Sequence, residues 1–122
     1  EVVSLADINQ HLIKGIAQRL QLTTQFHRSS LLGFKTQRTQ RLIDISESLH
    51  CDTYLSPPGA QEYIDEDGHF KGAAVHLDYQ SFTPVPYKQG AVTDNFISHL
   101  SIVDVLANLG WQGTQEYIRH DC

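Results

Sequence analysis

The clearest alternation of hydrophobic and polar positions lies in the central part of the chain. Between Thr36 and Leu49, the apolar residues Leu42, Ile45 and Leu49 recur at i, i+3 and i+7, which is the spacing of one helix face. The opposite face is polar. The pattern therefore predicts an amphipathic helix over residues 36–49, whose three apolar side chains are buried in one core together with Leu55.

The hydrophobic period changes after this helix. Residues 53–55 form a short, β-prone run between polar and turn residues, which predicts a buried strand at 52–56. We expect Cys51, directly before this strand, to be a buried, reduced thiol. Pro58 lies where the next predicted helix, residues 60–64, opens, and the missing N–H of proline costs nothing at a helix start.

Two further segments are predicted to be strands. Residues 74–80 alternate, with Val75, Leu77 and Tyr79 on one face and polar side chains on the other, as in a strand with one solvated side. Residues 22–27 alternate poorly but are rich in threonine and phenylalanine. The acidic run at residues 65–68 is predicted to be a turn, and it lacks the ligand spacing of a calcium loop.

Helices are predicted at both ends of the chain. Residues 4–20 carry a continuous apolar stripe, and Ser4 is a capping residue with Asp7 three positions later. Residues 100–109 form a second amphipathic run that Gly110 ends, and residues 111–120 allow one more short helix.

This order of elements predicts an α/β fold. Strands that alternate with helices indicate parallel pairing and right-handed crossovers. We expect residues 1–122 to form a single α/β domain with a three-layer arrangement, in which helices flank a mainly parallel sheet. Three such strands correspond to about half of a doubly wound sheet, a partial Rossmann-like fold.

Composition narrows the class of protein. The net charge of −5 over 122 residues gives no general basic field, so nucleic-acid binding is not expected. No run of about 18 apolar residues and no signal peptide are present, so we expect a cytoplasmic protein without a membrane span. No cofactor is predicted. The chain starts at Glu1 and contains no methionine, so we expect a piece of a longer protein that lacks an amino-terminal half.

Ligands of parallel sheets bind beyond the carboxyl ends of the strands. Three segments of the chain are predicted to end there, and their hydroxyls and cations suit a phosphate or carboxylate. The candidate substrate-binding residues in these segments are Ser29, Ser30, Lys35, Thr36, Arg38, Ser56, Gly59, Tyr87 and Gln89.

Lys35, Arg38 and Arg41 recur every three residues at the start of the central helix. Cations are disfavoured at a helix N-terminus, so their presence there indicates an anion, either a ligand or acidic side chains. In the alternative interpretation, Arg41 pairs with Asp44 or Glu62 at the surface and Lys35 is solvated. The sequence leaves both interpretations open.

Other chemistries receive little support. Ser56 follows a predicted strand, but the Gly-x-Ser-x-Gly pattern of a nucleophile elbow is absent. The histidines do not pair at i, i+3 or i, i+4, so no metal site is predicted; a cluster of His69, His76 and His99 would need the fold to assemble it. Catalytic residues stay unknown, although four carboxylates are candidates for a general base: Asp65, Glu66, Asp67 and Asp78.

Short motifs follow one another in a definite order between Ser29 and Gly110. They are Lys35-Thr36, Arg41–Ile45, Tyr54–Ser56, Gly59, Tyr63–Asp65, Phe70, Tyr87, Gln89, Phe96, Leu100–Leu106, Asn108 and Gly110. No single motif is specific, but the ordered series resembles the WbqC-like protein family. The run from Ser56 to Gly59 departs from the Ser-Gly that the family tends to have there.

The resemblance implies a bacterial protein associated with surface-polysaccharide, O-antigen or glycolipid biosynthesis, with an undefined activity. It includes Arg41, which the spacing of cations already made a candidate, and adds Tyr63 to the candidate binding residues. The expected partner is an anionic small molecule, a sugar phosphate or a nucleotide sugar, and the expected role is a transferase or an accessory enzyme. The alternative is a non-catalytic binding or interaction module that retains the fold, so whether the chain is an enzyme stays open.

Overall fold

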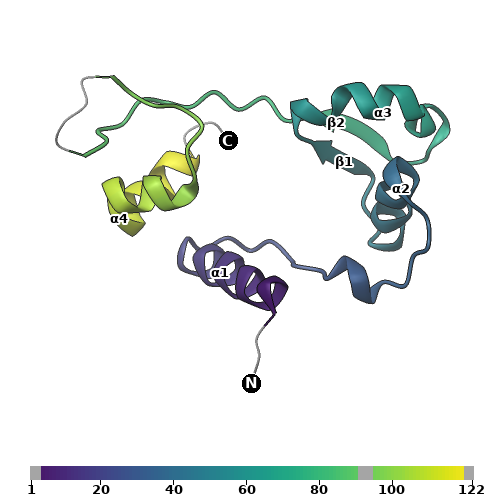
Figure 1. Ribbon diagram of the computed structural model, residues 1–122, viewed down its shortest axis with the longest axis horizontal. Helices are drawn as coiled ribbons and strands as arrows, with labels where there is room; N and C mark the ends of the chain where they lie inside the picture. Colours follow the sequence, from purple (N-terminus) through teal and green to yellow (C-terminus); the bar gives the residue numbers. More distant parts are fainter. Residues whose placement is uncertain (1–3, 91–94, 120–122) are drawn as a thin grey trace. The chain divides into compact units, whose positions relative to one another are not determined.

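The computed structural model describes residues 4–90 and 95–119, which belong to two compact units (Figure 1). The helical unit combines Glu1–Phe26 with Phe82–Cys122, and the sheet unit is His27–Ser81. The helices are α1 (Leu5–Arg19), α2 (Arg38–Ser48), α3 (Gln61–Asp67) and α4 (Ile102–Arg119), and the strands are β1 (Thr53–Ser56) and β2 (His76–Tyr79). Short 3-10 turns lie at Ser29–Leu31, Pro58–Ala60 and His69–Gly72.

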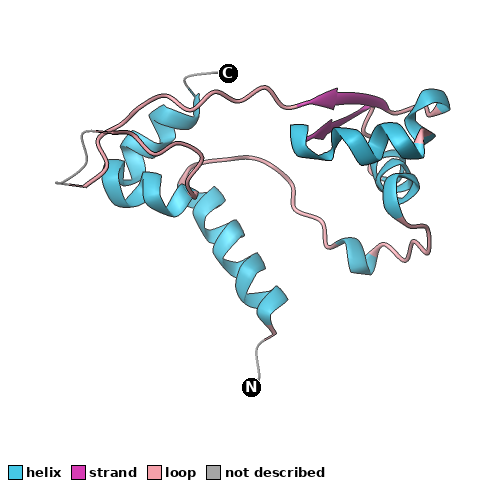
Figure 2. Cartoon of the chain, turned by 45° about the horizontal axis from the view of Figure 1, so that its top comes forward, coloured by secondary structure: helices cyan, strands magenta, loops and turns pink. Residues whose placement is uncertain are grey.

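The sheet unit is built on a parallel pair of strands. Strands β1 and β2 pair in a register that places Thr53 beside His76 and Ser56 beside Tyr79, and α3 is part of the connection between them. Figure 2 shows this pair with α3 alongside it. The structure thus confirms the two predicted strands and their parallel pairing, and the chain is a mixed helix and strand protein.

The predicted strand at residues 22–27 is wrong. These residues are irregular and exposed, and the sheet of the described residues has two strands. A strand is stable only where a neighbouring strand takes its backbone hydrogen bonds and a core takes one face, and this poorly alternating segment has neither. The three-stranded sheet is therefore not formed.

Helix α2 confirms the predicted helix, but its buried face differs from the predicted one. Ile43 is 3% exposed, and Thr39 and Ser46 are buried with it at i, i+4 and i+7, whereas Leu42 and Ile45 are half-buried. The buried stripe is thus rotated because the first turn of the helix is held by a buried threonine. A residue of α3 provides the partner of that threonine, and the pattern of apolar residues gave no sign of this contact.

Three local predictions in the sheet unit are also wrong. Leu55 is 62% exposed, because β1 turns Tyr54 and Ser56 inward and its other side chains outward. Cys51 is exposed, since it lies before the paired residues of β1. The acidic residues 65–67 form the last turn of α3 instead of a loop, and Gly68, with φ of 65°, ends the helix.

The helical unit follows the sequence more closely. The Ser4 side chain caps α1 by accepting a hydrogen bond from the Asp7 N–H at 3.2 Å. Ser101 accepts in the same way from the Val103 N–H at 3.1 Å, and Gly110, with φ of 66°, separates two segments of α4 as predicted. None of the described helices has the length and apolar character needed to cross a membrane.

Candidate functional site

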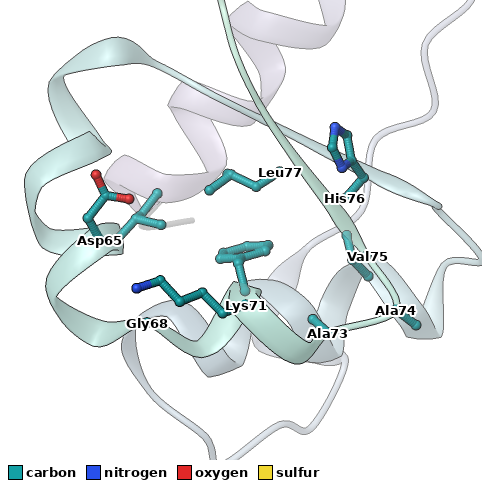
Figure 3. Close-up of a pocket in the computed structure, with 10 residues that line it drawn as sticks. Asp65, Gly68, Lys71, Ala73, Ala74, Val75, His76 and Leu77 are labelled. Atoms are coloured by element: carbon teal, nitrogen blue, oxygen red, sulfur yellow. The ribbon is translucent and has the colours of Figure 1, made fainter.

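A pocket of about 370 Å³ lies in the sheet unit, between the end of α3, the 3-10 turn and the start of β2. Its apolar lining includes Ile64, Phe70 and Leu77, and its charged lining includes Asp65 and Lys71. Figure 3 shows the carboxylate of Asp65 and the ammonium of Lys71 on the same side of the pocket. This is the concave, mixed polar and apolar surface that small-molecule sites usually have.

Local backbone geometry explains how these side chains come together. Gly68 adopts the left-handed conformation that ends α3, and its N–H donates to Ile64 O at 3.0 Å. The chain then reverses, so that Phe70 and Lys71 follow Asp65 around the same pocket. The Phe70 ring is fixed against the sheet, because it stacks on Tyr54 with 5.7 Å between ring centroids.

The two charged groups of the pocket are not paired with other protein groups. Within residues 4–90 and 95–119, neither Asp65 nor Lys71 makes an ion pair or a side-chain hydrogen bond. The pocket therefore presents one free cation and one free carboxylate beside an aromatic ring. A lysine donates to anionic oxygens, and a carboxylate accepts from hydroxyl groups.

A second polar cluster joins α3 to the start of α2. Asp67 Oδ1 pairs with Arg38 Nη2 at 3.0 Å, and Asp67 Oδ2 accepts from the Thr39 hydroxyl at 3.0 Å. Thr39 Oγ1 also lies 2.8 Å from His69 Nδ1. Partial burial raises the pKa of Asp67, but the hydrogen bonds from Thr39 and the charges of Arg38 and His69 together outweigh it, so the pKa is lowered.

This cluster determines where the predicted cations lie. Arg38 contacts the last residue of α3, whereas Ser56 and Gly59 precede its first residue. The ion pair with Asp67 therefore places Arg38 at the end of α3 that is farther along the chain from these two residues. The exposed or half-buried residues Ser29, Ser30, Lys35 and Arg41 are spread over the same unit, and ligand contact by them stays a prediction.

Asp44 has a different partner from the one considered in the alternative interpretation. Its carboxylate accepts from the Thr36 hydroxyl at 2.5 Å and from the Gln40 amide at 2.8 Å. These two hydrogen bonds lower the pKa of Asp44, and the bond from Thr36 makes the larger contribution. The predicted residue Thr36 thus fastens the segment before α2 to the helix.

Hydroxyl groups gather at the carboxyl ends of the two strands. Ser56 is 1% exposed, and its register partner Tyr79 carries a buried hydroxyl oxygen without a hydrogen-bond partner. Burial, then the charges of Asp65 and Tyr63, raise the pKa of Tyr79, so this hydroxyl keeps its proton. Ser56 is the last residue of β1, and Tyr63 is close enough for its charge to affect Tyr79. Ligand contact by Ser56 and Tyr63 stays a prediction.

The predicted residues Tyr87 and Gln89 lie in the helical unit and are held by α4. The Tyr87 hydroxyl donates to Asp104 Oδ2 at 2.6 Å, and the Gln89 amide donates to the same oxygen at 3.1 Å. Gln89 also bonds both backbone groups of Ile97. Burial and the bond to Asp104 raise the pKa of Tyr87. These bonds organise the loop, and substrate contact by either residue stays a prediction.

Sequence reasoning missed Lys71 and the structural role of His69 and Thr39. Lys71 follows a helix end that was interpreted as a turn, and correct placement of Gly68 as a helix cap would have put Lys71 and Asp65 close together. Asp65 and Asp67 were noted only as general bases. Among the described residues, no three His, Cys, Asp or Glu side chains are grouped to hold a metal ion.

Comparison with known proteins supports the resemblance noted in the sequence. The model of the WbqC-like protein family matches residues 1–116. The expectation of a missing amino-terminal half stays a prediction. An uncharacterised protein of Mycobacterium tuberculosis, Rv1507c, is 26% identical over 119 residues, which are 96% of this chain and 49% of that protein. The chain thus spans about half the length of this curated relative.

No solved structure matches. With nearly its whole length covered by the family model, the chain belongs to the WbqC-like protein family.

Proposed function

We propose that this protein binds an anionic sugar, a sugar phosphate or a nucleotide sugar, as a transferase or accessory enzyme of bacterial surface-polysaccharide or glycolipid biosynthesis. The observation that carries the proposal is that one pocket holds both a free Lys71 ammonium and a free Asp65 carboxylate beside the Phe70 ring. We propose a cytoplasmic setting for it.

The chemistry of the pocket suits such a ligand. The Lys71 ammonium has three donors for a phosphate or carboxylate group, and Asp65 accepts from sugar hydroxyls. The face of the Phe70 ring is electron-rich and attracts the weakly positive C–H groups of a sugar. Asp65 repels a second anion, so the charged end of the ligand belongs at Lys71 and its neutral end at Asp65.

The exposed face of the sheet and the predicted binding residues also form part of the proposal. The outward face of β1 leaves Leu55 62% exposed, although parallel sheets are usually covered on both faces. We propose that the three-layer, Rossmann-like arrangement is completed by a further layer on this face. A large ligand such as a nucleotide sugar would extend beyond the pocket, toward the remaining predicted residues in the sheet unit: Ser29, Ser30, Lys35, Arg41, Ser56, Gly59 and Tyr63.

The second candidate function is a binding module without catalysis. It is favoured by a specific observation: the polar groups of several predicted site residues bond other residues of the same protein. Arg38 pairs with Asp67, Thr36 bonds Asp44, and Tyr87 bonds Asp104. A module of this kind would bind the sugar and leave it unchanged on prolonged incubation, whereas a transferase would consume it in the presence of an acceptor.

The test measures ligand binding by thermal shift and calorimetry, with glucose 1-phosphate and UDP-glucose as probes. Wild type is compared with Lys71→Ala, Lys35→Ala and the control Lys14→Ala, which removes an exposed lysine from α1. A charge-assisted contact is worth about 1.5–3 kcal/mol, so Lys71→Ala should weaken binding roughly ten- to a hundredfold. Added salt should also weaken it.

Each outcome of this test has a meaning. Loss of binding in Lys71→Ala alone supports the pocket. Loss in Lys35→Ala alone moves the anion to the segment before α2. Wild type that responds to neither probe overturns the proposed ligand class.

A further inference from the structure

Strand β2 has one edge that pairs with β1 and one edge that is open. The His76 N–H donates to Asp52 O at 2.7 Å, which directs the main-chain groups of His76 toward β1. Because successive residues of a strand turn these groups to opposite edges, Leu77 and Tyr79 direct theirs away from β1. In the described part of the chain the sheet has no further strand, so this edge presents unpaired N–H and C=O groups.

The pocket that holds Lys71 reaches the main chain of β2. Its lining includes residues 73–77 in succession. His76 is among them, although its side chain is 73% exposed and its Nε2 lies 3.8 Å from Asp78 Oδ1. Figure 3 shows His76 and Leu77 on opposite sides of the strand, with Leu77 on the side of Lys71. The pocket therefore contacts the backbone of this segment, and the open edge is the one that a ligand can reach.

The main-chain groups beside the pocket have no partner in the protein. Across residues 4–90 and 95–119, neither the N–H nor the C=O of Val75 or Leu77 makes a hydrogen bond. Val75 is nevertheless only 2% exposed. Buried main-chain groups are nearly always hydrogen-bonded, so their partners have to come from water or a ligand in the pocket.

A sugar hydroxyl suits this edge better than a phosphate does. The N–H and the C=O of Leu77 leave the strand on the same side, so a donor and an acceptor lie next to each other. A hydroxyl group both donates and accepts, whereas an ionised phosphate oxygen only accepts and is repelled by the carbonyl oxygen. We propose that the Leu77 N–H donates to one hydroxyl of the sugar and that the Leu77 C=O accepts from the neighbouring hydroxyl.

This inference rests on the proposed function and deepens it, because it names the part of the ligand that each side of the pocket binds. Lys71 holds the charged group, and the open edge of β2 holds two adjacent hydroxyls. The site therefore selects a polyhydroxylated anion, such as a sugar phosphate, over a simple anion of the same charge.

Hydrogen exchange of the backbone amides, measured by NMR on the wild type, tests this contact. Saturating glucose 1-phosphate should slow the exchange of the Leu77 amide roughly tenfold. The Tyr79 amide is the matched control, because it lies at the same open edge but outside the lining of the pocket, and its exchange should not change. Inorganic phosphate should slow neither amide, and equal slowing of Leu77 by inorganic phosphate would overturn the assignment of a hydroxyl.

Removal of the donor gives the second test. Cys51 permits ligation of a synthetic segment, residues 51–122, in which an ester oxygen replaces the N–H of Leu77. Loss of one neutral hydrogen bond should weaken glucose 1-phosphate roughly three- to tenfold and leave the binding of inorganic phosphate unchanged. The same ester at Tyr79 is the control, since each ester also weakens one carbonyl that bonds β1, and the Tyr79 ester should bind as wild type does.

The failures of the two proposals are distinguishable. Glucose 1-phosphate that binds through Lys71 without slowing the exchange of Leu77 would overturn the role of Leu77 and leave the proposed function in place. Equal slowing of Leu77 and Tyr79 would also overturn it, because a strand added by a peptide or a second copy covers the whole edge. Wild type that does not bind glucose 1-phosphate would overturn both the proposed function and the contact at Leu77.

Discussion

The Thr39 hydroxyl donates to Asp67 Oδ2 at 3.0 Å and joins the first turn of α2 to the last residue of α3. The backbone of Thr39 also helps to lower the pKa of Asp67. Gln37, at the N-cap position, makes no side-chain cap bond, and the Asp67 carboxylate of a different helix bonds the first turn of α2 instead. The negative charge is favourable there because helix N-termini carry partial positive charge.

We predict that Thr39→Val destabilises the sheet unit by about 1–3 kcal/mol, because it removes the partner of buried polar groups while keeping the shape of the side chain. Thr39→Ser retains the hydroxyl and should cost less than Thr39→Val. Urea unfolding followed by circular dichroism measures both variants. Equal destabilisation by valine and serine would show that the methyl group of Thr39 matters and the hydroxyl does not.

We also predict a contribution of Asp67 to acid sensitivity. Its pKa is lower in the folded protein than the usual value of about 3.9, so the stabilisation by its ionised form is complete above that pH. This stabilisation is lost as the pH falls through the folded pKa. In Asp67→Asn the unfolding temperature should therefore be lower than that of wild type at pH 7, and the difference should shrink below pH 4. A difference that stays constant from pH 7 to pH 3 would contradict the assignment.

Sequence patterns predicted the elements whose cause is local. Ser4 with Asp7, and Gly110 in α4, form the caps and the break that their residue types favour. The alternation of residues 74–80 likewise predicted β2, since each strand residue faces either the core or solvent. In these cases one short segment carries the whole signal.

The sequence-based predictions failed where a residue far away in the chain determines which side chains are buried or bonded. The rotation of α2 depends on Asp67, which is 28 positions from Thr39. No period within residues 36–49 could show that a polar threonine would be more buried than the leucines. Arg38 pairs with Asp67 for the same reason, and ligand contact by Arg38 stays a prediction. The pocket was missed because Gly68 was interpreted as part of a loop and not as a helix end.

The rotation of α2 itself leads to a prediction. Ile43 is 3% exposed and Ile45 is half-buried, so Ile43→Ala should cost about 2–5 kcal/mol and Ile45→Ala clearly less. The two substitutions remove the same atoms from the same helix, so helix propensity changes equally in both. Chemical unfolding of the pair decides the question, and a greater loss in Ile45→Ala would restore the face inferred from the sequence.

Two tyrosines with opposite surroundings allow the last prediction. The hydroxyl of Tyr79 is buried without a hydrogen-bond partner, whereas that of Tyr87 donates to Asp104 at 2.6 Å. Removal of an unpaired buried hydroxyl is neutral or stabilising, and removal of a paired one is destabilising. Tyr79→Phe should therefore leave the unfolding temperature unchanged or raise it, and Tyr87→Phe should lower it. Differential scanning calorimetry of the two variants measures this difference in sign. A clear drop in the unfolding temperature of Tyr79→Phe would mean that the Tyr79 hydroxyl is hydrogen-bonded in the free protein, by water or by a neighbouring group. The hydroxyl would then not be an unused donor at the ends of the strands.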